Sequence, residues 1–372
     1  MPKIVAGVDS STQSVKVVLR DADSGELIAS TSRPHPEGTE VNPLEWKRAL
    51  DSALDELSSH EISAIAIGGQ QHGMVALDSE GKVIRNALLW NDTRSDKAAD
   101  ALNAEIPDIH QRTGSKLVAS FTASKVRWLA DKEKSNAEKV SAIALPHDWL
   151  SWQLTGASSL ATLFTDRSDA SGTGYFDSVK NQYCRDIFAT ALRSEREVIL
   201  PTITAPHLFG GETAQGIPIA AGAGDNAGAA LGLGAGVGDL VISLGTSGTA
   251  FAVSSTPTHD PSGEVAGFAD ATGNFLPLAC TLNAAKVFDT VAKTLGISFE
   301  EFSSLALSAP LGADGLRVIP HFDGERTPNR PQARGSFAGI THSNFTRANI
   351  ARAAIEGVIA GMVYATQAVE KL

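Results

Sequence analysis

An isolated aspartate in a glycine-rich stretch is the residue of this sequence best suited to acid–base chemistry. Asp225 stands in Gly-Ala-Gly-Asp-Asn-Ala-Gly, after the apolar segment 218–221, which predicts a buried strand that ends beside it. Glycines carry no Cβ, so a ligand or another stretch of backbone can approach closely. A carboxylate held there could take the proton of a hydroxyl group. A close-packed turn without a ligand is the structural alternative for such a stretch.

Two hydroxyl-rich turns lie far from each other along the chain. Ser10–Ser14 follows a predicted strand that ends at Asp9, and Gly245–Gly248 joins two predicted strands within 240–253. Turns of glycine and hydroxyl residues offer backbone N–H groups to phosphate oxygens. Two hairpins of one type predict a duplicated architecture, with one hairpin in each domain and both facing a common ligand. Together with Asp225 as a base, they favour phosphoryl transfer.

Polar side chains follow two further predicted strands. Gln71 and His72 lie between glycines after the apolar segment 62–67, and Trp90 and Asp92 follow Leu88 and Leu89 in the same way. Open α/β sheets bind ligands at the ends of their strands. A turn with a satisfied histidine explains Gln71 and His72 equally well at this stage.

The pattern around these groups predicts an α/β chain. Residues 4–30 predict a three-stranded meander, and Asn42 followed by proline and an acid predicts the start of a helix that continues to about residue 58. Further predicted helices include 122–132 and 146–154, whose tryptophans suit a core. The segment 165–173 reads as a polar loop with solvated charges.

The last third of the chain predicts helices and one strand. Helices are expected over 284–295 and 299–307, and a strand over 316–320. A loop with an unusual concentration of charge, 322–329, follows, and 347–372 predicts a long amphipathic helix.

Composition narrows the class of protein. The 372 residues carry a net charge of −11 without a basic cluster, which disfavours nucleic acid and anionic membrane as partners. Two cysteines form no disulfide framework, and no apolar run reaches the length of a membrane span. We therefore expect a cytoplasmic location. The sequence contains no P-loop, no zinc-protease His-Glu-x-x-His and no Gly-x-Ser-x-Gly elbow.

In this set of segments the chain resembles the FGGY family of carbohydrate kinases, and within it the members that phosphorylate D-xylulose. The similar segments are spread over the whole chain and include Asp9–Lys16, Gly69–Gly73, Leu89–Arg94, Phe121–Lys125, Leu145–Leu150, Ser168–Thr173, Ala223–Gly228, Ser243–Thr249 and Gly324–Pro328. The Gln71-His72 pair discriminates within the family, because glycerol kinases carry an Arg-Glu pair there.

The resemblance implies an actin-like ATPase fold with two RNase-H-like domains around a cleft. We expect an N-terminal sugar-binding domain over 1–233 and a C-terminal nucleotide-binding domain over 234–372. The implied reaction converts D-xylulose and ATP into D-xylulose 5-phosphate with the help of Mg²⁺. A homodimer is also expected from the family.

The resemblance also assigns roles to single residues. Asp225 is expected to be the general base and Asp9 to hold the magnesium. The sugar would be bound by Gln71, His72, Trp90, Asp92, Asp225 and Asn226. The nucleotide phosphates would be lined by Thr12, Lys16, Gly245, Thr246 and Ser247.

Two departures from the family pattern leave alternatives open. Ser11 occupies a position in the first turn where a glycine is usual. Family members also continue beyond the position of Leu372 with a glycine-rich segment that cradles adenine, so we expect the second domain to be incomplete. A sugar-binding fragment with impaired ATP binding, and a kinase for another ketose or polyol such as ribulose, are the alternatives. Actin-like or chaperone ATPases would share the hairpins without needing Gln71 and His72.

Overall fold

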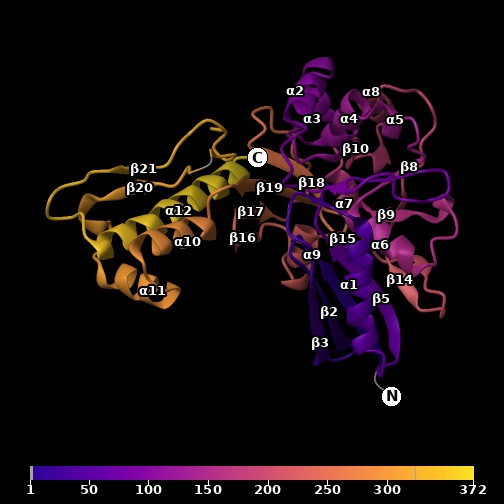
Figure 1. Cartoon of the computed structure of the whole chain (residues 1–372), viewed down its shortest axis with the longest axis horizontal. Coiled ribbons are helices and arrows are strands. Elements are labelled where there is room, and N and C mark those ends of the chain that lie inside the picture. The colour runs from indigo at the N-terminus through magenta and orange to yellow at the C-terminus, as the bar shows by residue number, and fades with distance from the viewer. Residues whose placement is uncertain (1–2, 323) are drawn as a thin grey trace. The chain divides into compact units, whose positions relative to one another are not determined.

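The computed structural model describes residues 3–322 and 324–372 of the chain, which divides into two compact units (Figure 1). The N-terminal unit runs to Gly234 and includes Phe268–Phe275. The C-terminal unit comprises Ala235–Gly267 and Leu276–Leu372. Among the described residues, no helix combines the length and the apolar content needed to cross a bilayer.

A mixed seven-stranded sheet forms the centre of the N-terminal unit. Its strands follow the order β13-β14-β5-β1-β2-β3, and β15 also pairs with β5. The predicted meander is confirmed, because β1, β2 and β3 are consecutive antiparallel neighbours. The strands are β1 (Ile4–Ser10), β2 (Ser14–Asp21), β3 (Leu27–Pro34), β5 (Ile62–Gly69), β13 (Phe209–Glu212), β14 (Pro218–Ala220) and β15 (Ala223–Gly224).

Helix α1 (Pro43–Glu56) packs on β2 and β3. Asn42 caps it as predicted, because its side chain accepts a hydrogen bond from the N–H of Leu44. Trp46 and Leu50 are buried against the sheet, and full burial of a leucine contributes roughly 1.5–3 kcal/mol. The same core contains both tryptophans of α6 (Pro146–Leu154), which confirms them as core residues.

Shorter elements complete the N-terminal unit. Helix α4 (Thr122–Lys132) has the predicted bounds. The other elements are β4 (Glu40–Val41), β6 (Val75–Leu77), β7 (Ala87–Leu88), α2 (Asp96–Glu105), α3 (Ile109–Thr113), α5 (Lys134–Ala137), β8 (Ala142–Ala144), η1 (Leu160–Thr162), β9 (Phe164–Asp166), α7 (Arg167–Ser171), β10 (Phe176–Asp177), β11 (Gln182–Tyr183), α8 (Arg185–Leu192), β12 (Thr202–Thr204) and α9 (Asp225–Gly232).

The prediction of a solvated polar loop over 165–173 is wrong. This segment contains the end of β9 and the five-residue helix α7, and its side chains are buried. The charges are satisfied inside the protein: Asp166 caps α7 by accepting hydrogen bonds from the N–H groups of Ser168 and Asp169. Arg167 donates to the carbonyl oxygen of Ser178. These hydrogen bonds compensate the burial of Asp166 and Arg167, whereas Asp169 Oδ1 is buried without a hydrogen-bond partner.

The described residues of the C-terminal unit form a four-stranded sheet, a two-stranded sheet, three α-helices and a short 3-10 helix. The four-stranded sheet has the order β16-β17-β19-β18, with β16 (Leu240–Leu244) as predicted. The remaining elements are β17 (Gly248–Ala252), β18 (Val265–Ala269), β19 (Phe275–Thr281), α10 (Ala285–Leu295), α11 (Phe299–Ser308), η2 (Ala313–Gly315), β20 (Arg317–Ile319), β21 (Ser336–Ala338) and α12 (Arg347–Glu370). The strands β18 and β19 were not predicted.

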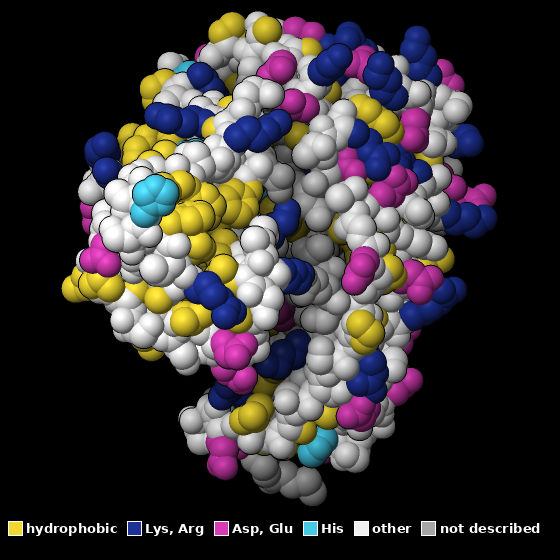
Figure 2. All heavy atoms as spheres, turned by 60° about the vertical axis from the view of Figure 1, so that its left-hand side comes forward, with side chains coloured by type: hydrophobic (Ala, Val, Ile, Leu, Met, Phe, Trp, Pro, Cys, Tyr) yellow, Lys and Arg dark blue, Asp and Glu magenta, His cyan; other side chains and the backbone are white. Residues whose placement is uncertain are grey.

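The long helix α12 has two different faces. Val358 and Met362 are buried in the cores of the C-terminal unit, whereas Ile359, Val363 and Tyr364 are exposed. Figure 2 shows that hydrophobic side chains gather in a patch among charged ones on the face turned to the viewer.

Candidate active site

Three strand ends bring Asp225, the predicted general base, and Asp9, the predicted magnesium ligand, to one edge of the sheet. Strands β1 and β15 both pair with β5 in parallel, and Asp9 and Ala223 both stand opposite Gly68. Because parallel strands end at the same edge, Asp9 and the residue after β15, Asp225, reach that edge together. Their carboxylates are near enough for the charge of Asp9 to raise the pKa of Asp225.

Asp225 is the first residue of α9, a helix that the sequence did not predict. Its Oδ1 accepts hydrogen bonds from the backbone N–H and the side-chain amide of Asn226, at 2.7 and 2.8 Å. Surrounding protein atoms crowd the carboxyl group and raise its pKa to about 6, although the residue stays accessible to solvent. The hydrogen bonds from Asn226 limit this rise. At neutral pH the group is mostly ionised and has the strength of a useful base.

The first hydroxyl-rich turn is built by hydrogen bonds of its own residues. Ser11, which replaces the usual glycine, donates its hydroxyl to the carbonyl oxygen of Ser14 at 3.1 Å. Lys16 stands directly opposite Asp9 in the β1–β2 hairpin. Partial loss of hydration raises the pKa of Asp9, and the positive charge of Lys16 lowers it.

Trp90 joins this turn rather than standing alone at a sugar site. Its indole Nε1–H donates to Thr12 Oγ1 at 2.8 Å. Trp90, a predicted sugar contact, therefore holds Thr12, a predicted phosphate contact, in place. Whether Trp90 also touches the sugar stays a prediction.

Gln71 and His72 are held firmly by α7 and the residue that follows it. Gln71 Nε2 donates to the carbonyl oxygen of Ser168 at 3.1 Å, and His72 Nδ1 lies 2.5 Å from the carbonyl oxygen of Gly172. The His72 ring also packs against Phe121, with centroids 4.8 Å apart. Only 6% of Gln71 and 8% of His72 is exposed. Any contact with a sugar therefore uses a small part of each side chain.

Gly224 explains why glycine recurs in this stretch. A Cβ atom on Gly224 would lie 2.7 Å from Gln71 Nε2, which is too close for any other residue type without rearrangement. The N–H of Gly224 donates to Ser168 Oγ at 3.0 Å. Gly224 therefore connects the segment that carries Asp225 both to Gln71 and to α7.

Asp92 lies in a buried polar network. It accepts hydrogen bonds from Thr39 Oγ1 at 2.8 Å and from Arg94 Nε at 2.9 Å. Burial raises its pKa, but these hydrogen bonds outweigh the effect, so the pKa is lowered overall. The nearby Lys125 is fully buried, and burial lowers its pKa to about 7 despite the charge of Asp92. Sequence reasoning assigned no role to Lys125, since nothing local predicts a buried lysine in an amphipathic helix.

The second hydroxyl-rich turn belongs to the C-terminal unit. Gly245 N–H donates to the carbonyl oxygen of Ser247 at 3.0 Å, which closes the β16–β17 turn, and Ala285 at the start of α10 donates to the Gly245 carbonyl at 2.9 Å. Gly245 and Thr246 are exposed. That this turn and the first one face a common ligand stays a prediction.

The charged loop after β20 is fixed inside the C-terminal unit. Glu325 accepts hydrogen bonds from the N–H of Leu282 at 2.6 Å and from Asn283 Nδ2 at 2.9 Å. Asn283 also bonds the backbone just before this glutamate: its Oδ1 accepts from the N–H of Phe322, and its Nδ2 donates to the carbonyl oxygen of Gly324. Asp323, which was part of the predicted loop, lies outside the described residues.

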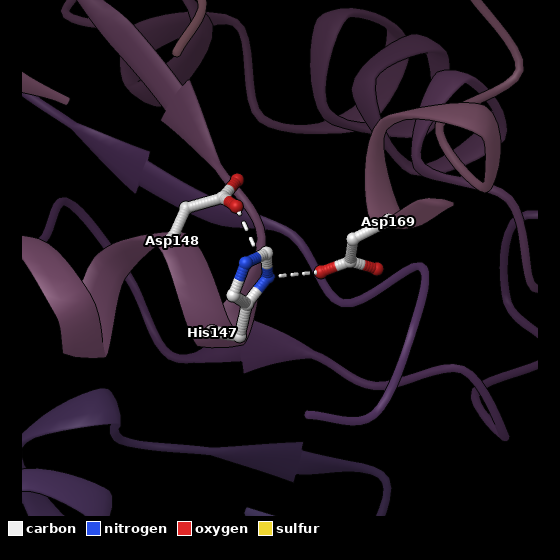
Figure 3. A group of neighbouring side chains, drawn as sticks. All are labelled: His147, Asp148 and Asp169. Atoms are coloured by element: carbon white, nitrogen blue, oxygen red, sulfur yellow. Dashed lines mark hydrogen bonds and ion pairs between the residues drawn. The ribbon is translucent and has the colours of Figure 1, made fainter. Parts of the chain in front are cut away.

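A buried cluster of charged side chains that the sequence did not predict lies in α6 and α7. Figure 3 shows the His147 imidazole between the carboxylates of Asp148 and Asp169. His147 Nδ1 lies 2.5 Å from Asp169 Oδ2 and 3.1 Å from Asp148 Oδ1. Such a set could in principle hold a metal ion, but a separation of 2.5 Å is that of a strong, charge-assisted hydrogen bond. A shared proton therefore explains the cluster.

Comparison with known proteins shows which protein family and which relatives the chain is similar to. Residues 4–232 match the model of the N-terminal domain of the FGGY family of carbohydrate kinases, and residues 240–372 match its C-terminal domain. The xylulose kinase of Streptomyces coelicolor is 42% identical over 373 residues, which cover 96% of this chain and 74% of that protein.

Solved structures of kinases are also similar to this chain. The xylulose kinase of Bifidobacterium adolescentis superimposes with a TM-score of 0.90 at 42% identity, covering 100% of this chain and 83% of that one. The gluconate kinase of Lactobacillus acidophilus also reaches a TM-score of 0.90, at 25% identity and with 99% and 78% coverage. A shared fold in this group therefore does not by itself select the sugar.

Proposed function

This chain belongs to the FGGY family of carbohydrate kinases, and from that premise we propose that it transfers the γ-phosphoryl group of ATP to D-xylulose, giving D-xylulose 5-phosphate. The fold is the two-domain, actin-like ATPase fold of that family. The substrate is inferred from relatives at 42% identity that are xylulose kinases, whereas the gluconate kinase is more distant.

The observation that carries the proposal is the placement of Asp225. Its carboxylate stands at a strand end beside Asp9, is oriented by Asn226, and has a pKa near the working pH. In the proposed step Asp225 takes the proton of the acceptor hydroxyl as that oxygen bonds to the γ-phosphorus and the bond to ADP breaks. A positioned general base contributes typically ~10²–10⁴-fold to such a rate.

The sugar side of the site is proposed to consist of Gln71, His72, Trp90 and Asp92. Gln71 and His72 are rigidly held by backbone carbonyl groups, and Asp92 is kept ionised by its hydrogen bonds. Preorganised polar groups of this kind lose little entropy on binding a hydroxylated ligand. Ribulose and other near relatives are competing substrates that the assay below separates.

The phosphate side is proposed to consist of the two hydroxyl-rich turns. Thr12 and Lys16 in the first and Gly245, Thr246 and Ser247 in the second would line the ATP phosphates. The exposed carboxylate of Asp9 suits Mg²⁺, which prefers oxygen ligands, so Asp9 is the residue proposed to hold it. When bound, the ion would neutralise charge on the phosphates.

The domain roles extend this assignment. We propose residues 1–233 as the sugar-binding domain and residues 234–372 as the nucleotide-binding domain. A cytoplasmic location and a homodimer stay predictions.

An ADP-release assay with a panel of acceptors tests the proposal. We expect turnover with D-xylulose to exceed that with D-ribulose, gluconate and glycerol. Asp225→Ala should lower kcat at least 100-fold, because the general base is lost. Calorimetry should find D-xylulose binding to this variant within a few-fold of the wild-type affinity.

Two outcomes would contradict the proposal. Normal turnover by Asp225→Ala would remove Asp225 as the base. Binding of D-xylulose without binding of MgADP would instead support a sugar-binding module. His207→Gln, at an exposed histidine outside the proposed site, serves as the matched control and should turn over normally.

A further inference from the structure

The short helix α7 contacts both the sugar side and the base side of the candidate site. The Ser168 carbonyl accepts a hydrogen bond from Gln71, and the Gly172 carbonyl just after the helix is bonded to His72. The Ser168 hydroxyl accepts a hydrogen bond from the N–H of Gly224, the residue before Asp225. A displacement of α7 would therefore move residues of both sides.

His147 makes a second connection between α7 and the segment that carries Asp225. Its Nδ1 lies 2.5 Å from Asp169 of α7, and its Nε2 lies 3.3 Å from the carbonyl oxygen of Ala221. Gly222, the next residue, has a backbone φ of +81°, and a Cβ there would lie 2.6 Å from His147 Cδ2. The imidazole ring thus fills the space beside this backbone.

The surroundings of His147 favour the charged imidazolium. The groups nearest to both ring nitrogens are acceptors: Asp169 and Asp148 face Nδ1, and Ala221 and Asp166 face Nε2. Both nitrogens must carry a proton to donate to them. These aspartates come from α6, β9 and α7, and all are buried, so their charges favour the imidazolium. Although burial lowers the pKa of His147, these charges raise it to about 10 overall.

We propose that the His147 imidazolium, paired with Asp169, is a positioning residue for Asp225. His147 ties the Ala221–Gly222 backbone to α7. Ser168 ties Gly224 to the same helix. The stretch that leads into Asp225 is then fixed at two points, Ala221 and Gly224, which aims the Asp225 carboxylate at the acceptor hydroxyl. This inference rests on the proposed role of Asp225 as the base.

The expected kinetic effect is on kcat rather than on sugar binding. His147→Gln has a similar size but no charge, and it cannot donate to Asp169 and Ala221 with the same geometry. A misplacement of a reacting group by ~1 Å can lower a rate by about 10²-fold, so we expect kcat to fall roughly 10- to 100-fold. His147 accepts or donates no hydrogen bond with Gln71 or His72, so KM and Kd for D-xylulose should change less than about threefold.

Rescue by a second cation separates positioning from mere packing. His147→Lys keeps the charge and several donors, and we expect it to recover most of the kcat that His147→Gln loses. Asp169→Asn, which removes the partner charge, should lower kcat like His147→Gln. His207→Gln, at an exposed histidine of the same unit, should leave kcat unchanged. Thermal melting of each variant checks that it is folded.

A spectroscopic readout does not depend on catalysis. With ¹⁵N-labelled histidine, one ring of the wild-type protein should stay doubly protonated at pH 8.5, and its signals should be absent in His147→Gln. A neutral His147 at that pH would overturn the inference, as would a folded His147→Gln with wild-type kcat, or equal loss in the Lys and Gln variants. Wild-type protein without sugar kinase activity would instead refute the proposed function.

Discussion

At the scale of single residues, the side chains placed at strand ends were the ones the sequence could predict. Asp9 and Asp225 follow apolar segments directly, and a strand that ends at a polar residue is a local signal. His147 gives no such signal, because its partners Asp169 and Ala221 are 22 and 74 residues away. Sequence reasoning therefore finds residues that face a ligand more readily than it finds the residues that hold these in position.

The raised pKa of Asp225 makes a prediction for the pH dependence of the reaction. The base acts when deprotonated, so kcat/KM for the sugar should rise with pH and level off above about 6. Below that pH the logarithm of kcat/KM should fall with a slope of one. The measurement is a profile from pH 5 to 8 at saturating MgATP, with the coupling enzymes in excess.

A profile that stays flat down to pH 5 would contradict this prediction, because a carboxyl group with an ordinary pKa near 4 loses its proton well below that range. The same profile with His207→Gln is the control and should match the wild type.

At the scale of elements, long periodic segments were predicted well and short buried ones were not. α4 and α6 have the predicted bounds, since their patterns extend over 11 and 9 residues, and the five-residue β16 was predicted from its apolar residues. α7 was mistaken for a solvated loop because its five residues, four of them polar, carry no periodicity. Its burial depends on partners that only the folded chain supplies, such as Ser178 for Arg167.

The loop around Glu325 offers a test of a short segment in the C-terminal unit that depends on distant partners. Its carboxylate accepts hydrogen bonds from Leu282, Asn283 and Arg326, which fixes the loop to the end of β19. Glu325→Ala leaves these donors without their acceptor, and each unsatisfied buried group costs about 1–3 kcal/mol. We expect the free energy of unfolding, measured in urea, to fall by at least that amount.

Glu300→Ala removes an exposed glutamate from α11 and is the matched control, with an expected change below about 1 kcal/mol. A loss as small as this in Glu325→Ala would show that the loop does not depend on the carboxylate.

At the scale of the whole molecule, the two units have separate hydrophobic cores. One core lies around the sheet and α1 in the N-terminal unit, and the others pack around α12 in the C-terminal unit. The sequence predicted a duplicated architecture from two similar hairpins. The sequence could not predict that Phe268–Phe275 belongs to the N-terminal unit, because the amino-acid composition does not change at either end of this segment.

Separate cores predict that each ligand protects its own unit from hydrogen exchange. D-Xylulose should slow exchange at residues 69–73, 168–173 and 223–228, and MgADP should slow it around residues 243–249. Mass spectrometry of peptides from each unit measures both effects. Residues 299–308 of α11 serve as the internal reference, and protection by xylulose in the C-terminal unit alone would contradict the domain assignment.

The shared volume of Gly222 and His147 has a consequence for evolution and for enzyme engineering. A Cβ atom at position 222 would lie 2.5 Å from the carbonyl oxygen of Ile67 and 2.6 Å from His147 Cδ2, and the backbone φ of +81° disfavours any residue other than glycine. A combinatorial library that diversifies this part of the site should therefore keep glycine at 222, and a smaller residue at 147 should not rescue its replacement, because the Ile67 carbonyl and the backbone φ are unchanged.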